Sequence, residues 1–189
     1  MANRNTQGFG LIPAGRLGGG PSIQGQGKYK IDAGHSTTIY NGECVKISSG
    51  YVVGGNGSAA DIVGVLNGIF FNAATTMKPT FSNFYKATIT PANSEDTTAF
   101  VIDDPFQQYV VGADDATGVT TILETYDMNS SAGSDTTGKS SSTLDIGTTS
   151  ANGKQFRLLR SEDPENEDAT AAFASVVVVS NLNSFNGHN

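Results

Sequence analysis

Residues 61–71 read DIVGVLNGIFF, the most apolar stretch of the chain, and its conformation separates a helical fold from an all-β one. Gly64 and Gly68 stand four residues apart, a spacing that taken alone also fits a helix. Two glycines within a segment rich in β-branched and aromatic residues favour a buried strand that bends or carries a bulge. We therefore predict a strand here, with a helix as the alternative.

A second decisive stretch, residues 174–179, reads ASVVVV. A run of β-branched residues of this kind predicts a central strand that is buried on both faces. Asn41-Gly42 predicts a hairpin turn, because both residues tolerate positive φ. This turn is predicted to join strands at 37–40 and 43–47. Further strands are predicted at 28–31, 51–53, 83–90, 99–103, 107–111, 119–126, 144–146 and 155–159. Short strands at this spacing, with almost no helical period, predict an all-β fold: a single compact β-barrel or sandwich around one core.

The amino-terminal segment differs in composition from the rest of the chain. Residues 1–30 carry four basic residues and no acidic one, whereas the remainder carries seven basic and eighteen acidic residues. The first 27 residues also contain eight Gly, so they bury too little apolar surface to offset their ordering entropy. We predict an extended, mobile or surface-laid arm at 1–27, a β-rich domain at 28–182 and a fraying tail at 183–189. The domain includes a long, small and polar loop at 128–143.

Apolar and basic side chains are spaced along this arm and into the first strand. Such spacing predicts docking to an acidic or apolar protein surface, while a frayed terminus without a role and nucleic-acid binding are the alternatives. The acidic body disfavours nucleic acid as a partner. The residues that we expect to contact the partner are Arg4, Phe9, Leu11, Ile12, Arg16, Leu17, Ile23, Lys28 and Lys30.

No catalytic motif emerges from the sequence, and we expect neither enzymatic activity nor a cofactor. The chain has one Cys, two His and no Trp, which excludes an internal disulfide and disfavours a His-rich metal site. Cys44 is predicted to be a buried structural thiol, because only His35 could serve as its base. No stretch is long and apolar enough to cross a membrane, and the amino terminus lacks the apolar core of a signal peptide.

Carboxylates are the abundant titratable groups, and they fall in predicted loops. Asp103-Asp104 and Asp114-Asp115 could serve glycoside hydrolysis only beside a substrate cleft. The run at 162–168, EDPENED, is predicted to be a solvated loop or a contact to a basic partner. Calcium binding is the alternative, because a loop rich in carboxylate oxygens can surround that ion.

Four stretches resemble small virion proteins encoded by marine tailed phages, particularly podoviruses of the cyanophage type. They are 1–34 (MANRNTQGFGLIPAGRLGGGPSIQGQGKYKIDAG), 52–79 (VVGGNGSAADIVGVLNGIFFNAATTMKP), 89–111 (ITPANSEDTTAFVIDDPFQQYVV) and 155–179 (QFRLLRSEDPENEDATAAFASVVVV). A fainter likeness, to lambda-type head decoration proteins with their β-tulip-like barrel, rests on NGECVKISSGYVV at 41–53 and DIVGVL at 61–66.

This resemblance implies a capsid decoration, or cement, protein. Such a protein is made in the host cytoplasm, binds the outer surface of the assembled head and clamps neighbouring copies of the major capsid protein. The resemblance also implies a homo-oligomer, most commonly a trimer. The alternatives are a tail- or fibre-associated β-domain that binds a host receptor or glycan, and a head–tail connector component. The receptor-binding alternative requires exposed aromatics on loops, and Phe81, Phe84, Tyr85 and Phe106 are the candidates, which we expect instead to be core residues.

Overall fold

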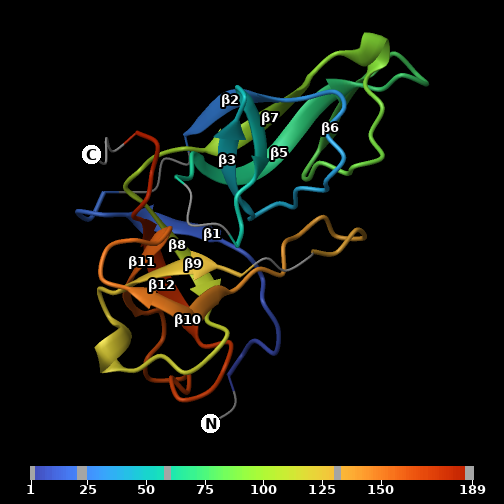
Figure 1. The fold of residues 1–189 in the computed structure, drawn as a ribbon. Coiled ribbons are helices and arrows are strands. Elements are labelled where there is room, and N and C mark those ends of the chain that lie inside the picture. Colours follow the sequence, from blue (N-terminus) through green and yellow to red (C-terminus); the bar gives the residue numbers. More distant parts are fainter. Residues whose placement is uncertain (1–2, 21–24, 58–60, 130–132, 186–189) are drawn as a thin grey trace.

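The computed structural model describes residues 3–20, 25–57, 61–129 and 133–185. These residues form twelve strands in two antiparallel sheets, with two short 3₁₀ helices, η1 (Ala92–Ser94) and η2 (Val119–Thr121). The all-β prediction is confirmed. Figure 1 shows the two sheets as two lobes, one above the other, with β1 at their boundary.

Sheet I forms the lower lobe in Figure 1. Its strands, in spatial order, are β1 (Ile12–Arg16), β8 (Gln107–Gly112), β12 (Ser175–Ser180), β11 (Phe156–Ser161), β9 (Thr125–Met128) and β10 (Leu144–Ser150). All six residues of β12 are buried between β8 and β11, as the valine run predicts. The sheet curls so far that Leu144 in β10 forms a parallel bridge to Ala113, just beyond β8.

Sheet II forms the upper lobe. Its strands, in spatial order, are β2 (Gln26–Ile31), β7 (Thr97–Ile102), β5 (Gly64–Asn72), β3 (Cys44–Ser48) and β4 (Tyr51–Gly54), with β6 (Pro79–Ser82) also paired to β5. The two ends of this order, β2 and β4, lie in contact, so this sheet curls as well. The hairpin of β5 and β6 extends the upper lobe away from sheet I (Figure 1).

The described residues form two clusters of buried apolar side chains, whereas the sequence predicted one core. The first fills the curl of sheet I, and the second fills the curl of sheet II. Sheet II contributes to both, because successive residues of a strand point to opposite faces. Val65 in β5 belongs to the first cluster and its neighbour Leu66 to the second. At 44–45, 64–66 and 101–102 the central strands of sheet II are therefore buried on both faces, and there they join the two lobes.

The stretch at 61–71 is a bent strand, and the helical alternative is wrong. The register between β5 and β7 shifts between Leu66 and Gly68, which is the bulge that the glycines predict. Gly64 lies so close to β7 that a Cβ atom placed on it would stand 2.1 Å from the carbonyl oxygen of Ile102. Glycine at this position lets the two backbones approach.

The Asn41-Gly42 turn forms, but the predicted hairpin around it does not. Gly42 has a φ of 81°, and the Glu43 amide donates to the Tyr40 carbonyl at 3.1 Å. Residues 37–40 do not pair with β3; Ile39 instead forms a bridge to Tyr85. Tertiary partners account for the difference, since β3 pairs with β4 and β5 on its two sides.

Other boundaries also differ from the sequence prediction. The chain bends through 83–90, where we predicted a strand, and the strand lies earlier, at β6. The predicted strand at 119–126 is divided between η2 and β9. β1 lies within the predicted arm. In the tail, Asn183 is buried and bridges Ile62, whereas residues 186–189 lie outside the described part of the chain.

Replacing Gly64 by Ala should destabilise the protein by about 1–3 kcal/mol, because the new methyl group overlaps the β7 backbone. Urea unfolding followed by circular dichroism measures the change. Gly118→Ala is the matched control, because its new methyl carbon would stand 3.9 Å from the nearest atom, Thr120 Oγ1, and its backbone is extended. We expect the control to stay within about 0.5 kcal/mol of the wild type. Equal effects of the two substitutions would contradict the close approach.

Candidate functional site

The segment predicted to be an arm folds back onto the body over much of its length. β1 pairs with β8, and Leu11, just before it, is 2% exposed within the first core cluster. The Leu11 amide donates to the Gly42 carbonyl at 2.8 Å, and the Gly10 amide donates to the Ser142 carbonyl at 3.1 Å. Part of the 128–143 loop is thereby covered: Ser140, Ser142 and Thr143 are buried, while residues 130–132 lie outside the described chain.

Arg4 binds the acidic run at 162–168 within the same chain. Its guanidinium lies 2.8 Å from a Glu162 oxygen, 3.6 Å from an Asp163 oxygen and 3.2 Å from Glu167 Oε1. The Glu167 side chain is 1% exposed and also accepts hydrogen bonds from the backbone amide and hydroxyl of Ser175. The acidic run thus contacts a basic side chain of the same chain.

The other basic residues of the predicted contact set divide into two groups. Arg16 pairs with Asp104, with 2.9 Å between Nε and Oδ2, and its guanidinium lies 5.6 Å from the centre of the Phe106 ring. Lys28 and Lys30 lie on β2 in sheet II with exposed side chains. The structure therefore does not bring the four basic residues together on one surface.

Three exposed apolar side chains lie at the β1 edge of sheet I. Ile12 is 50%, Leu17 47% and Phe106 46% exposed, and the Leu17 amide donates to the Phe106 carbonyl at 2.8 Å. We call these three residues the β1 strip. Among the described strands, β1 has a ladder partner on one side only, namely β8. The strip thus combines apolar surface with an open strand edge, and both features favour protein–protein contact.

The remaining predicted contact residues lie elsewhere. Phe9 is half-buried, and its ring lies against Gly112 in β8. Leu11 is a core residue and is closed to a partner. Ile23 lies outside the described residues. The sequence identified Ile12 and Leu17 correctly as apolar and accessible, but it held no sign that Phe106, about ninety positions later, lies beside Leu17.

Two of the four candidate aromatics were wrongly expected in the core. Phe81 is 65% exposed and Phe106 46% exposed, whereas Tyr85 is 1% exposed and Phe84 stacks on Tyr40. Phe81 lies in β6 at the end of sheet II, where the described chain places no further strand beyond it. An edge position leaves one side of such a residue open to solvent.

Most of the groups considered for catalysis are held by contacts within the chain. Cys44 is fully buried, its thiol donates to Asn56 Oδ1, and burial raises the pKa of this thiol well above its usual value. Burial lowers the pKa of His35. Asp103 accepts a hydrogen bond from the Tyr29 hydroxyl, and Asp114 accepts one from the Ile146 amide.

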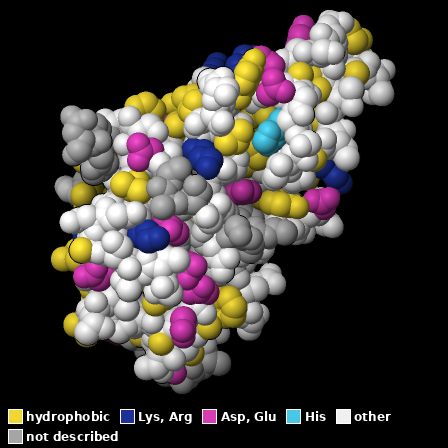
Figure 2. Space-filling model, viewed as in Figure 1, with side chains coloured by type: hydrophobic (Ala, Val, Ile, Leu, Met, Phe, Trp, Pro, Cys, Tyr) yellow, Lys and Arg dark blue, Asp and Glu magenta, His cyan; other side chains and the backbone are white. Residues whose placement is uncertain are grey.

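Within the described residues, no three His, Cys, Asp or Glu side chains gather in a way that could hold a metal ion. The helices of that same part of the chain are too short to cross a membrane. On the face drawn in Figure 2, acidic side chains are spread over both lobes.

Comparisons with protein-family models, with curated proteins and with solved structures found no match to this chain.

Glu43 is a mostly buried carboxyl in the turn that holds the amino-terminal segment. It accepts a hydrogen bond from the Tyr40 amide at 2.9 Å, and the adjacent Gly42 carbonyl accepts from Leu11. Burial raises the pKa of Glu43 from its ordinary value of 4.5 to about 7, although the bond from Tyr40 acts in the opposite direction.

Stability should therefore depend on pH through Glu43. Below pH 4.5 the carboxyl is protonated in both the folded and the unfolded protein, and its contribution is fully present. As the pH rises from 4.5 toward 7, the carboxyl ionises in the unfolded chain, while burial keeps it protonated in the folded protein. The unfolded state is thereby favoured, and the stabilising contribution is lost. Glu43→Gln keeps an acceptor for Tyr40 and should gain roughly 3 kcal/mol relative to wild type across this window. Urea unfolding at several pH values measures the gain, with circular dichroism as the check on folding; parallel curves would contradict it.

The Arg4 cluster should fasten the amino-terminal segment. Arg4→Gln leaves the buried Glu167 carboxylate without its guanidinium, so the melting temperature should fall. The double variant Arg4→Gln/Glu167→Gln should recover part of this loss, because no unpaired buried charge remains. Thermal melting of the single and double variants forms the test. Strictly additive losses would show that the two residues are not coupled.

Proposed function

We propose that this chain is a structural virion protein of the capsid decoration type, which docks on the major capsid protein at the outer surface of the head. The observation that carries the proposal is the β1 strip, an apolar and accessible surface at an open strand edge. Support also comes from the resemblance of the sequence to small virion proteins of marine tailed phages. On this proposal the protein is made in the host cytoplasm and assembles as a homo-oligomer, with a trimer expected.

The geometry changes which residues should contact the coat. Arg4 and Arg16 are engaged by carboxylates of the same chain, and Leu11 is in the core. We infer that apolar contact through Ile12 and Leu17, with Phe106 beside Leu17, provides the binding, and that the two arginines position this segment. Binding to the assembled shell but not to loose subunits would stabilise the shell by mass action.

A second candidate function, a tail- or fibre-associated domain that binds a receptor or glycan, is favoured by a different observation. Phe81 and its neighbour Phe70 are exposed on sheet II, whereas the β1 strip lies at the edge of sheet I. Exposed aromatics of this kind commonly lie in binding sites.

The test is binding of the purified protein to undecorated, expanded capsids. Deleting residues 1–27 would remove β1 and Leu11 from the fold, so substitutions are the sharper tool. Wild type should saturate the shell and raise its melting temperature, whereas Ile12→Asp/Leu17→Asp should bind at least about tenfold more weakly. Val119→Asp is the control, because Val119 is 87% exposed and lies outside the strip.

Failure of wild type to bind capsids would overturn the decoration proposal. Attachment of the wild type to host cells in the same experiment would support the receptor-binding candidate. Equal binding by all the variants would show that the coat recognises a surface other than the β1 strip.

A further inference from the structure

The outer face of sheet II carries a row of aromatic side chains. Phe70 in β5 is paired with Phe81 in β6, and Gly68 is paired with Phe100 in β7, so strand alternation places these residues on one face. Phe70 is 40% exposed, and Phe81 is 65% exposed. The rings of Phe81 and Phe100 lie 6.1 Å apart, and Phe81 lies over Gly68, which has no side chain to displace it.

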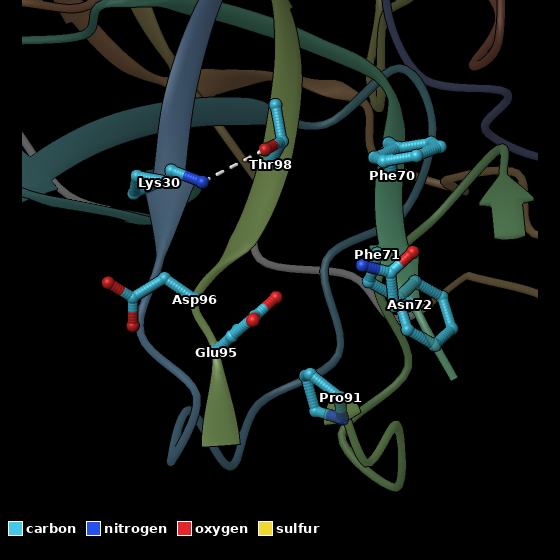
Figure 3. Close-up of a pocket in the computed structure, with 8 residues that line it drawn as sticks. All are labelled: Lys30, Phe70, Phe71, Asn72, Pro91, Glu95, Asp96 and Thr98. Atoms are coloured by element: carbon cyan, nitrogen blue, oxygen red, sulfur yellow. Dashed lines mark hydrogen bonds between the residues drawn. The ribbon is translucent and has the colours of Figure 1, made fainter. Parts of the chain in front are cut away.

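A hollow of about 120 Å³ adjoins this row where β2, β7 and β5 meet η1. Figure 3 shows Asn72 and Glu95 turned toward one another across it, with Phe70 above and Pro91 below. On the β2 side, the Lys30 ammonium donates to Thr98 Oγ1 at 3.1 Å. Two phenylalanines, Phe70 and Phe71, and four kinds of polar group thus surround a single small space.

The backbone beside the hollow is held in an uncommon conformation. Asn93 and Ser94, immediately before Glu95, have φ values of 55° and 54°, in the region that favours glycine. Asp96, on the other side of Glu95, accepts a hydrogen bond from the Ala33 amide at 3.2 Å. The backbone on both sides of Glu95 is therefore constrained, and strained backbone of this kind is found at binding sites.

The charges around the hollow indicate a neutral ligand. The carboxylates of Glu95 and Asp96 would repel a phosphate or another polyanion, and the Lys30 ammonium would repel a cation. A sugar satisfies all of these groups, because its hydroxyls both donate and accept hydrogen bonds and its C–H face packs on an aromatic ring.

The aromatic row indicates that the ligand is a chain of sugars. The hollow is smaller than the roughly 300–1,000 Å³ of a pocket that encloses a whole small molecule. It adjoins the rings of Phe70, Phe81 and Phe100, which lie on the same face of the sheet. We propose that this face of sheet II binds a neutral polysaccharide, with one sugar held by Asn72, Glu95 and Lys30 and its neighbours stacked on the rings. This proposal deepens the second candidate function and is independent of coat binding, because the β1 strip belongs to sheet I.

An array of neutral plant, algal, fungal and bacterial polysaccharides is the test, with heparin and single-stranded DNA as charged probes. The full chain should bind at least one neutral polysaccharide. Phe81→Ala and Glu95→Gln should each raise the Kd for that polysaccharide by at least about tenfold. Met77→Ala is the matched control, because Met77 is 60% exposed at the same end of sheet II but does not line the hollow, and its Kd should equal that of the wild type. Melting temperatures show that each variant is folded.

Absence of binding to every neutral polysaccharide would overturn the proposal, and so would binding to heparin or DNA alone. Unchanged affinity in both folded site variants would overturn it as well. Ile12→Asp/Leu17→Asp should keep polysaccharide binding, and Phe81→Ala should keep capsid binding. Failure of one proposal is thereby distinguished from failure of the other.

Discussion

Where sheet II meets sheet I, its central strands are buried on both faces, and this double burial governs how the two lobes can be arranged. Cys44, Val65 and Ile102 point into the cluster shared with sheet I, while their neighbours Val45, Leu66 and Val101 point into the cluster inside sheet II. Shifting one of these strands by a single residue would exchange the two sets and disturb both cores at once. Gly64, pressed against the Ile102 carbonyl, fixes the spacing between β5 and β7 that this arrangement needs.

Buried polar groups complete the junction between the lobes. The Gln155 side chain, just before β11, donates to the Gly55 carbonyl at 2.7 Å and accepts from the Met128 amide at 3.0 Å. Asn56 accepts from the Cys44 thiol and donates to the Ser142 hydroxyl. A buried hydrogen-bonded group is costly to leave unpaired, so these contacts favour one relative placement of the sheets. A fixed placement suits a protein that must present surfaces at set positions.

The two proposed surfaces then lie on different sheets of the chain. The β1 strip belongs to sheet I, and the aromatic row with its hollow belongs to the outer face of sheet II. A decoration protein with this arrangement would hold the coat through one sheet and present the other to its surroundings. The amino-terminal segment folds against the body, and Arg4 and Arg16 form ion pairs with carboxylates of the same chain. These two arginines therefore hold the segment in place and are not expected to attract an acidic partner.

Local chemistry along the chain was enough to predict the all-β class, the central position of the valine strand, the bulge in the strand at 61–71 and the buried state of Cys44. β-Branching, the period of two and the missing side chain of glycine all act over a few residues. The candidate surfaces followed only in part, since Ile12 and Leu17 are exposed as predicted while Leu11, between Gly10 and Ile12, is in the core. Other features became visible only in the folded chain: Arg4 meets Glu167, Phe106 lies beside Leu17, Ile39 bridges Tyr85, and Phe81 is exposed. These outcomes depend on which strands become neighbours and which become edges, and that choice is made by residues far apart in the chain.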